Sequence, residues 1–188
     1  MSGKTPDTSR TTPGIGSEEI RTAMHKEYRQ CIDDLRNPDK QTRARAAHAL
    51  GEAGDQAVDL LAPLLKDPEW KVRYRVAEAL GFSGSERAVS CLTGALTDPK
   101  DHVRYMAAKA IGLIGSGVAE GDLVARLGDE NEFVRRSAAI ALGKTGTPAA
   151  VTALKQSVIH ETSESTREGM LDAVEMLQKK YPGRIFIV

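Results

Sequence analysis

Residues Asp67 to Gly84 read DPEWKVRYRVAEALGFSG, and near-copies of this stretch recur along the chain. At a spacing of 31 residues follow Asp98 to Gly115, DPKDHVRYMAAKAIGLIG, and Asp129 to Gly146, DENEFVRRSAAIALGKTG. An upstream copy, NPDKQTRARAAHALGEAG, begins at Asn37, and a degraded copy lies near Glu161. A fixed period of this length is the signature of stacked supersecondary units, so the sequence predicts a repeat protein.

Composition limits the function classes that need to be considered. The chain carries 26 Lys and Arg against 26 Asp and Glu, so no overall charge favours nucleic acid or an anionic membrane. The chain has two cysteines, Cys31 and Cys91, which lack a metal-binding spacing and are too few for a disulfide framework. The absence of such a framework is typical of proteins in a reducing compartment. Apolar runs are much shorter than the roughly 18 residues of a membrane span, and the N-terminus has no apolar signal region. We therefore expect a cytoplasmic protein.

The chain order predicts two helices in each unit. Residues 1–16 are rich in Ser, Thr, Pro and Gly and are expected to be a disordered tail, after which Ser17 caps the first helix of a repeat domain that spans 17–180. Within a unit, one helix begins at the Asp-Pro corner, with Asp67 as its cap, and ends at Gly81, while the other is shorter. The expected pairs are 18–53, 55–84, 86–115, 117–146 and 148–179.

Two segments depart from the repeat. Glycines at 117, 121 and 128 flank or interrupt the shorter helix of the fourth pair, which is expected to be short or loosened. Residues 181–188 form an apolar C-terminal tail. The tail either covers the exposed end of the last repeat or docks to a partner.

The motif Asp-Pro-x-x-x-Val-Arg-x-x-Ala-Ala-x-Ala-Leu-Gly-x-x-Gly resembles the HEAT-like repeat, in the variety named after phycobilin lyases, from about Glu18 to Lys180. The resemblance implies an all-α fold, a right-handed α-solenoid of five HEAT-like helix pairs. It also implies that the Val-Arg helices line the concave side and that Asp and Arg form a ladder between units.

The most regular charged series contains one arginine per unit: Arg43, Arg73, Arg104, Arg135 and Arg167. Each follows an acid or an amide by six residues, starting from Asn37 in the first unit and Asp67 in the second. A basic stripe could bind phosphate. A guanidinium fork also binds carboxylates and helix-end carbonyls, and we favour this structural role, in which the series fixes the stacking of the units.

The phase of the Val-Arg helices predicts an exposed surface. Val72, Val76 and Leu80 recur every four residues and are expected to face the core, so the other positions point outward. The outward positions with aromatic, apolar or basic side chains are Trp70, Tyr74, Arg75, Phe82, His102, Tyr105, Met106, Lys109, Phe133, Arg136 and Ile140. This composition is typical of a protein-binding surface. In an alternative interpretation, some rings, Trp70 and Phe133 in particular, only pack against neighbouring repeats.

Sites for other chemistry are absent from the sequence pattern. Deoxyhypusine hydroxylase, a HEAT-like enzyme, holds two irons through His-Glu pairs placed after the inner-helix arginine. The corresponding pairs here are Ala44-Arg45, Tyr74-Arg75, Tyr105-Met106, Arg136-Ser137 and Glu168-Gly169. We expect no metal, no cofactor and no catalytic residue.

The sequence thus favours a non-enzymatic interaction module, a monomer that binds a peptide or protein segment in the concave groove, with an acidic or amphipathic helix among the expected ligands. Glu164, Glu168 and Asp172 make one end of the groove acidic, and the other units are mildly basic. A second hypothesis is a bilin lyase-type subunit, which the resemblance permits. A HEAT-like nucleic-acid-binding protein is a third, opposed by the zero net charge.

Overall fold

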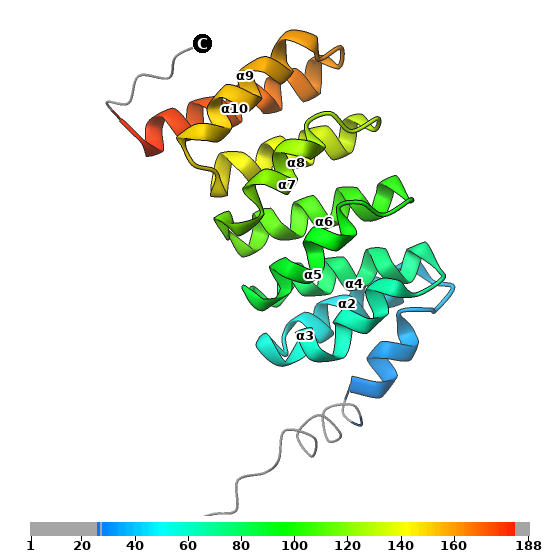
Figure 1. Ribbon diagram of the computed structural model, residues 1–188. Coiled ribbons are helices and arrows are strands. Elements are labelled where there is room, and N and C mark those ends of the chain that lie inside the picture. The colour runs from blue at the N-terminus through cyan, green and yellow to red at the C-terminus, as the bar shows by residue number, and fades with distance from the viewer. Residues whose placement is uncertain (1–25, 27, 183–188) are drawn as a thin grey trace, which may run out of the picture.

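The computed structural model describes residue 26 and residues 28–182 and consists of helix pairs stacked in one direction (Figure 1). The inner helices are α2 (Lys40–Gly51), α4 (Trp70–Phe82), α6 (Asp101–Ile114), α8 (Glu132–Thr145) and α10 (Glu164–Lys180). The outer elements are α3 (Asp55–Leu61), η1 (Ala62–Lys66), α5 (Arg87–Ala95), η2 (Gly117–Ala119), α7 (Glu120–Arg126) and α9 (Pro148–His160). Before α2, residues 28–34 are helical. The predicted all-α solenoid of helix pairs is confirmed.

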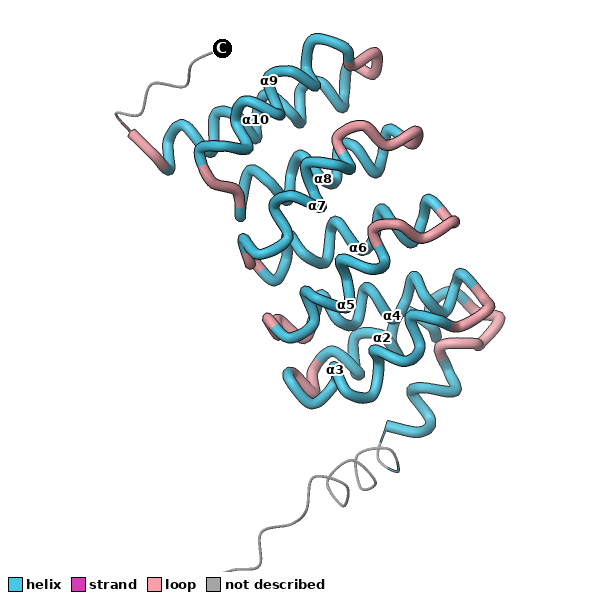
Figure 2. Tube along the Cα trace, in the orientation of Figure 1, coloured by secondary structure: helices cyan, strands magenta, loops and turns pink. Residues whose placement is uncertain are grey.

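The inner helices form one layer and the outer elements another. Each of α4, α6 and α8 packs against the inner helices before and after it, and the outer helix of its own pair packs on its side. The corners that precede the inner helices follow one another along one edge of the stack (Figure 2). An inner helix is therefore covered on three sides, which leaves only one narrow face exposed.

The corners start the inner helices in a different way from the predicted one. The Asp67 side chain accepts a hydrogen bond from the Glu69 amide at 2.9 Å, and Asp98 accepts one from Lys100 at 2.8 Å. These contacts form turns two residues long that precede the helices, and α4 begins only at Trp70. The prediction that Asp67 is the N-cap was wrong, because its carboxylate closes the turn and does not reach the helical amides.

Repeated glycines let neighbouring inner helices approach closely. A Cβ atom placed on Gly112 would lie 3.0 Å from both Cα and Cβ of Ala141, and one on Gly143 would lie 3.0 Å from Cα of Ala173. From the repeat pattern, the glycine equivalent to Gly81 was predicted to end the inner helix of each unit. That was wrong for Gly112 and Gly143, which lie inside α6 and α8. The true turn glycines include Gly115, with φ of 82°, a conformation that other residues rarely adopt.

An arginine ladder joins the units, as the sequence predicted. Arg104 donates through Nε and Nη2 to the two carboxylate oxygens of Asp129 in the next corner, at 2.8 and 2.9 Å, and through Nη1 to the Asp98 carbonyl at 2.9 Å. Arg73 binds Asp98 in the same way, and Arg135 binds Glu161. Each arginine therefore ties the corner of its own unit to the corner that follows.

The ladder changes at its two ends. Arg43 donates only to the carbonyls of Asn37 and Pro38, while Asp67 receives its guanidinium from Arg36. Arg167, in the degraded unit, donates to the Glu161 carbonyl. Hydrogen bonding keeps the ladder ionised: the Arg135 hydrogen bonds lower the pKa of Glu161 to about 2, although its burial acts in the opposite direction.

The remaining predictions concern the ends of the chain and the fourth outer helix. This helix is short, as expected, since η2 and α7 cover only three and seven residues. The tail predicted for residues 1–16, the Ser17 cap and residues 183–188 lie outside the described residues. Tyr181 is described, and its hydroxyl donates to the Gly146 carbonyl at 3.4 Å. Among the described helices, none combines the length and the apolar character needed to cross a membrane.

Candidate functional site

The exposed side of α2, α4, α6, α8 and α10, opposite the outer elements, is called the inner face below. Tyr74 of α4 and Tyr105 of α6 occupy equivalent positions in adjacent units, both partly buried against the core beneath them. Phe133, at the start of α8, is 60% exposed, and Ile140 on the same helix is 42% exposed. Aromatic and aliphatic side chains from three successive helices thus reach one surface.

Three adjacent hollows lie along this surface, and Tyr105 lines all of them. The first, of about 330 Å³, lies between α2, α4 and α6 and includes Trp70 and Tyr74. The second, of about 250 Å³, lies at the start of α6 and α8 beside His102 and Phe133. The third, of about 260 Å³, runs between α6 and α8 as far as Lys144. The three hollows, which share Tyr105, are together called the groove below.

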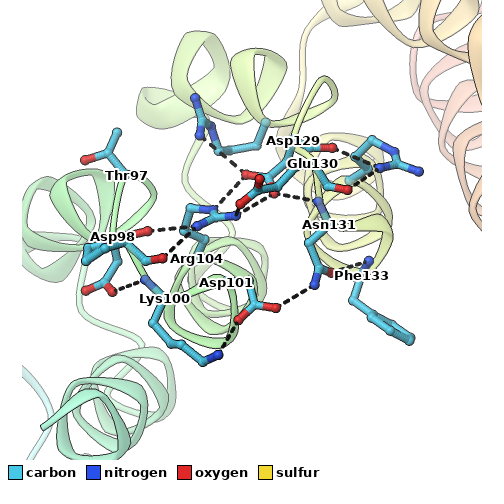
Figure 3. A network of polar contacts seen from close by, with 12 residues as sticks. Thr97, Asp98, Lys100, Asp101, Arg104, Asp129, Glu130, Asn131 and Phe133 are labelled. Carbon is cyan, nitrogen blue, oxygen red and sulfur yellow. Dashed lines mark hydrogen bonds and ion pairs between the residues drawn. The ribbon is translucent and has the colours of Figure 1, made fainter.

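A polar network fixes the middle of the groove (Figure 3). Asn131 accepts a hydrogen bond from the Phe133 amide at 2.9 Å, which caps α8, and donates through Nδ2 to Asp101 at 2.7 Å. Asp101 also accepts a hydrogen bond from the His102 amide at 2.8 Å and forms an ion pair with Lys100. The hydrogen bond from the His102 side chain has the largest effect and lowers the pKa of Asp101, and the bond from the His102 amide acts in the same direction. This carboxylate is therefore ionised at neutral pH. The network holds Phe133 and His102 in place at the start of their helices.

Sequence reasoning missed Asn131 and included two residues that do not belong to the exposed surface. An Asn two positions after Asp129, just ahead of the helical pattern, was the available signal for a cap. Met106 is 2% exposed and lies in the core, and Arg75 is 7% exposed and paired with Glu78, although it still lines the first hollow. Both were predicted to point outward. At the equivalent position of α8, the Ser137 hydroxyl donates to the Tyr105 carbonyl of α6 at 3.3 Å, so this position faces the inner helix of the preceding unit. The four-residue apolar period of one helix does not reveal this third buried side.

The alternative of packing between repeats holds for one of the two rings to which it was applied. The Trp70 ring lies 5.0 Å from the His102 ring, centre to centre, and Lys100 Nζ lies 5.5 Å from the Trp70 ring. Trp70 therefore packs against the next unit, although one side of it still lines the first hollow. Phe133 remains largely exposed. Phe82 is 45% exposed beside His48 and lines none of the three hollows.

The other predicted residues are placed as follows. Lys109 and Arg136 are exposed on α6 and α8 and line the third hollow together with Ile140. His102 is exposed and lines the first and second hollows. Within the described residues, no group of three or more His, Cys, Asp and Glu side chains could hold a metal ion.

This architecture, helix pairs stacked through an inner and an outer layer, defines an α-solenoid. The chain belongs to the HEAT-repeat family, because the family model for HEAT repeats matches residues 30–108 and 93–175. None of the curated protein sequences matches the chain.

Solved structures show the same fold at low sequence identity. The complex of CpcE and CpcF of phycocyanin lyase from Nostoc sp. PCC7120 contains a chain that is 22% identical, with a TM-score of 0.70 over 79% of this chain and 98% of that one. A computationally designed armadillo repeat protein for modular peptide recognition is 18% identical, with a TM-score of 0.55 over 87% and 95% of the two chains. Human deoxyhypusine hydroxylase is 22% identical, with a TM-score of 0.51 over 85% and 76%.

Proposed function

We propose that the protein is a non-enzymatic interaction module whose inner face binds a segment of another protein. The observation that carries the proposal is the set of three hollows that share Tyr105, with exposed Phe133 and Ile140 lining them. Large aromatic and aliphatic side chains that line concave surfaces supply most of the binding energy of protein interfaces. In an isolated chain these groups face water, and a bound segment would bury them.

The dimensions of the groove suit a peptide. Neighbouring inner helices pack at roughly 8–10 Å, so the path from α4 to α8 is about 20 Å long. An extended segment of about six residues or a helix of about 13 residues spans this distance. Two structural neighbours bind proteins or peptides: CpcE and CpcF form a complex, and the designed armadillo protein was made to recognise peptides. These likenesses concern the fold and support a role in protein binding.

The proposal is tested by affinity capture from the source cells followed by mass spectrometry, with two matched variants. Phe133→Ser/Ile140→Ser removes two exposed apolar side chains of the inner face. Val118→Ser/Ile159→Ser removes two from the outer elements, where these residues are 85% and 72% exposed. Proteins captured by the wild type and by the outer variant but lost with the inner variant support the proposal. Capture that depends only on the outer residues contradicts it.

The structural likeness to a phycocyanin lyase chain keeps a bilin lyase-type subunit as the second candidate. A subunit of that kind would handle a chromophore in the same groove, where aromatic rings can stack on a conjugated ligand. Co-expression with a bilin separates the two candidates. Visible absorbance that copurifies with the wild type and is lost with Phe133→Ser/Ile140→Ser would favour the bilin role over a protein segment.

A further inference from the structure

The charges that line the groove are strongly biased, although the whole chain is neutral. Seven basic side chains line the three hollows, whereas the single acidic residue is Asp101. Asp101 is already engaged by Lys100, His102 and Asn131. The groove therefore carries a local positive charge that the composition of the chain does not reveal.

Within the part of the chain that the structure describes, most of these basic side chains have no ion-pair partner. Arg75 pairs with Glu78, and Arg43 donates to backbone carbonyls. The other five basic residues are exposed and make no ion pair with a described carboxylate; they are Lys40, Lys71, Lys109, Arg136 and Lys144. A ligand that supplies carboxylates would find partners along the whole groove.

Apolar and basic groups alternate in the third hollow. Lys109, Arg136 and Lys144 surround Leu113 and Ile140, and no acidic side chain lines this space. Leu113 is 48% exposed. A complementary ligand must therefore carry apolar side chains and negative charges within the same short segment.

The charge changes sign at the end of the stack. Glu164, Glu168 and Asp172 of α10 are exposed and follow directly after the basic positions of α8. A polyphosphate backbone carries uniform negative charge and would be repelled where it crossed α10. A peptide can place its acidic residues over α4 to α8 and neutral or basic residues over α10.

We infer that the segment bound by the inner face is an acidic peptide with interspersed aromatic or aliphatic residues, oriented with its acidic part over α4, α6 and α8. This inference rests on the proposed function, because it concerns the ligand of the same groove. The apolar residues of the peptide fill the hollows beside Tyr105 and Phe133, and its carboxylates pair with Lys109, Arg136 and Lys144. Charge complementarity of this kind selects partners and speeds their association.

A displayed library of random peptides, each about 13 residues long to match the path of about 20 Å at 1.5 Å per helical residue, tests the inference with the full-length protein. Three forms are immobilised in parallel: the wild type, Lys109→Glu/Lys144→Glu and the control Lys66→Glu/Lys155→Glu. The control makes the same charge change on η1 and α9 of the outer layer. Lys109→Gln/Lys144→Gln is a milder inner variant that keeps the helix-compatible side chains, and circular dichroism verifies the fold of each.

The wild type and the control should enrich peptides rich in Asp and Glu with interspersed aromatic or aliphatic residues. For a selected peptide, the affinity should fall about tenfold or more in Lys109→Glu/Lys144→Glu and less in the Gln variant, and Lys66→Glu/Lys155→Glu should leave it unchanged. Raising the salt from about 0.05 to about 0.5 M should weaken binding to the wild type, because the screening length shortens.

The possible failures are distinguishable. Peptides that depend on Phe133 and Ile140 but show no acidic bias would overturn the inferred chemistry and leave the proposed function standing. Peptides that bind the Phe133→Ser/Ile140→Ser variant equally well, or no enrichment at all, would overturn both. Tighter binding of a single-stranded DNA of about 20 nucleotides than of any selected peptide, lost in Lys109→Glu/Lys144→Glu, would show that the basic groove serves a nucleic acid.

Discussion

Replacement of Arg104 by alanine should destabilise the stack more than any other single change in the ladder. The residue is 6% exposed, and its guanidinium makes two hydrogen bonds to Asp129, one to Glu130 and one each to the carbonyls of Asp98 and Pro99. Alanine removes all five and leaves Asp129 buried in an incompletely paired state. The change tests whether the ladder, and not apolar packing alone, fixes neighbouring units.

The magnitude follows from what Asp129 retains. Removal of one partner of a buried ion pair typically costs about 3–5 kcal/mol. Asp129 keeps the Asn131 amide at 3.0 Å and Arg126 at 3.5 Å, which reduces the penalty. We expect a loss of about 2–3 kcal/mol, because charged hydrogen bonds contribute about 1.5–3 kcal/mol each before compensation. The midpoint of thermal unfolding should fall by about 5–10 °C in a chain of this length.

Arg87→Ala is the matched control, measured by circular dichroism in the same thermal and denaturant series. Arg87 also joins two units, through Asp59 at 2.7 Å, but both side chains are more than half exposed. An exposed pair contributes less than about 1 kcal/mol. If Arg104→Ala costs no more than Arg87→Ala, the ladder does not stabilise the stack and the structural role of the arginines is refuted.

Three further changes test the packing and the ends of the stack by unfolding measurements. Gly112→Ala should lower the free energy of unfolding by about 1–3 kcal/mol, because the new methyl group collides with Ala141. Gly94→Ala on α5 has free space and should raise the free energy of unfolding by up to about 1 kcal/mol. Equal effects of the two changes would contradict the close approach of the inner helices. The pKa of Glu161 is lowered to about 2, so the stability that the ionised Glu161 gives to the fold is complete above pH 4.5 and is lost as the pH falls towards 2. Glu161→Gln should remove this part of the dependence of stability on pH, and an unchanged pH profile of stability in the variant would refute the role of Glu161. A chain that ends at Gly146 should stay helical and melt at a lower temperature, since each unit contacts only its neighbours, and complete unfolding would contradict a stack of that kind.

The repeat sequence was sufficient to predict the helix pairs and the ladder. Both depend on features that recur in every unit, so each copy supports the others: an acid or an amide at the corner, an arginine six residues later and an apolar period of four. The shortened fourth outer helix was also predictable, because Gly117 and Gly121 replace residues that favour helix. These properties are local to one unit or to its repetition.

Apart from the Asp67 and Asn131 caps, which are local to a corner, the errors concern contacts between units. Met106 and Arg75 are buried because a neighbouring inner helix covers their side, and Gly112 is required because Ala141 of the next helix approaches it. Neither this burial nor the approach of Ala141 to Gly112 follows from the apolar period of a single helix, since both depend on how far apart and at what angle the helices stack. For the same reason, the sequence identified Tyr105 as a surface residue but did not predict that it joins three hollows.

The central claim, that the inner face binds a protein segment, is tested most directly by calorimetric titration of a partner recovered by capture. The partner is titrated into the wild type, into Phe133→Ser/Ile140→Ser and into the outer control Val118→Ser/Ile159→Ser, all with matching circular dichroism. Removal of exposed apolar anchors at the centre of an interface costs about 2 kcal/mol or more, which is a roughly 30-fold loss of affinity. We predict that loss for the inner variant and unchanged affinity for the control. Equal affinities for all three folded proteins would contradict the claim and place the binding site elsewhere on the molecule.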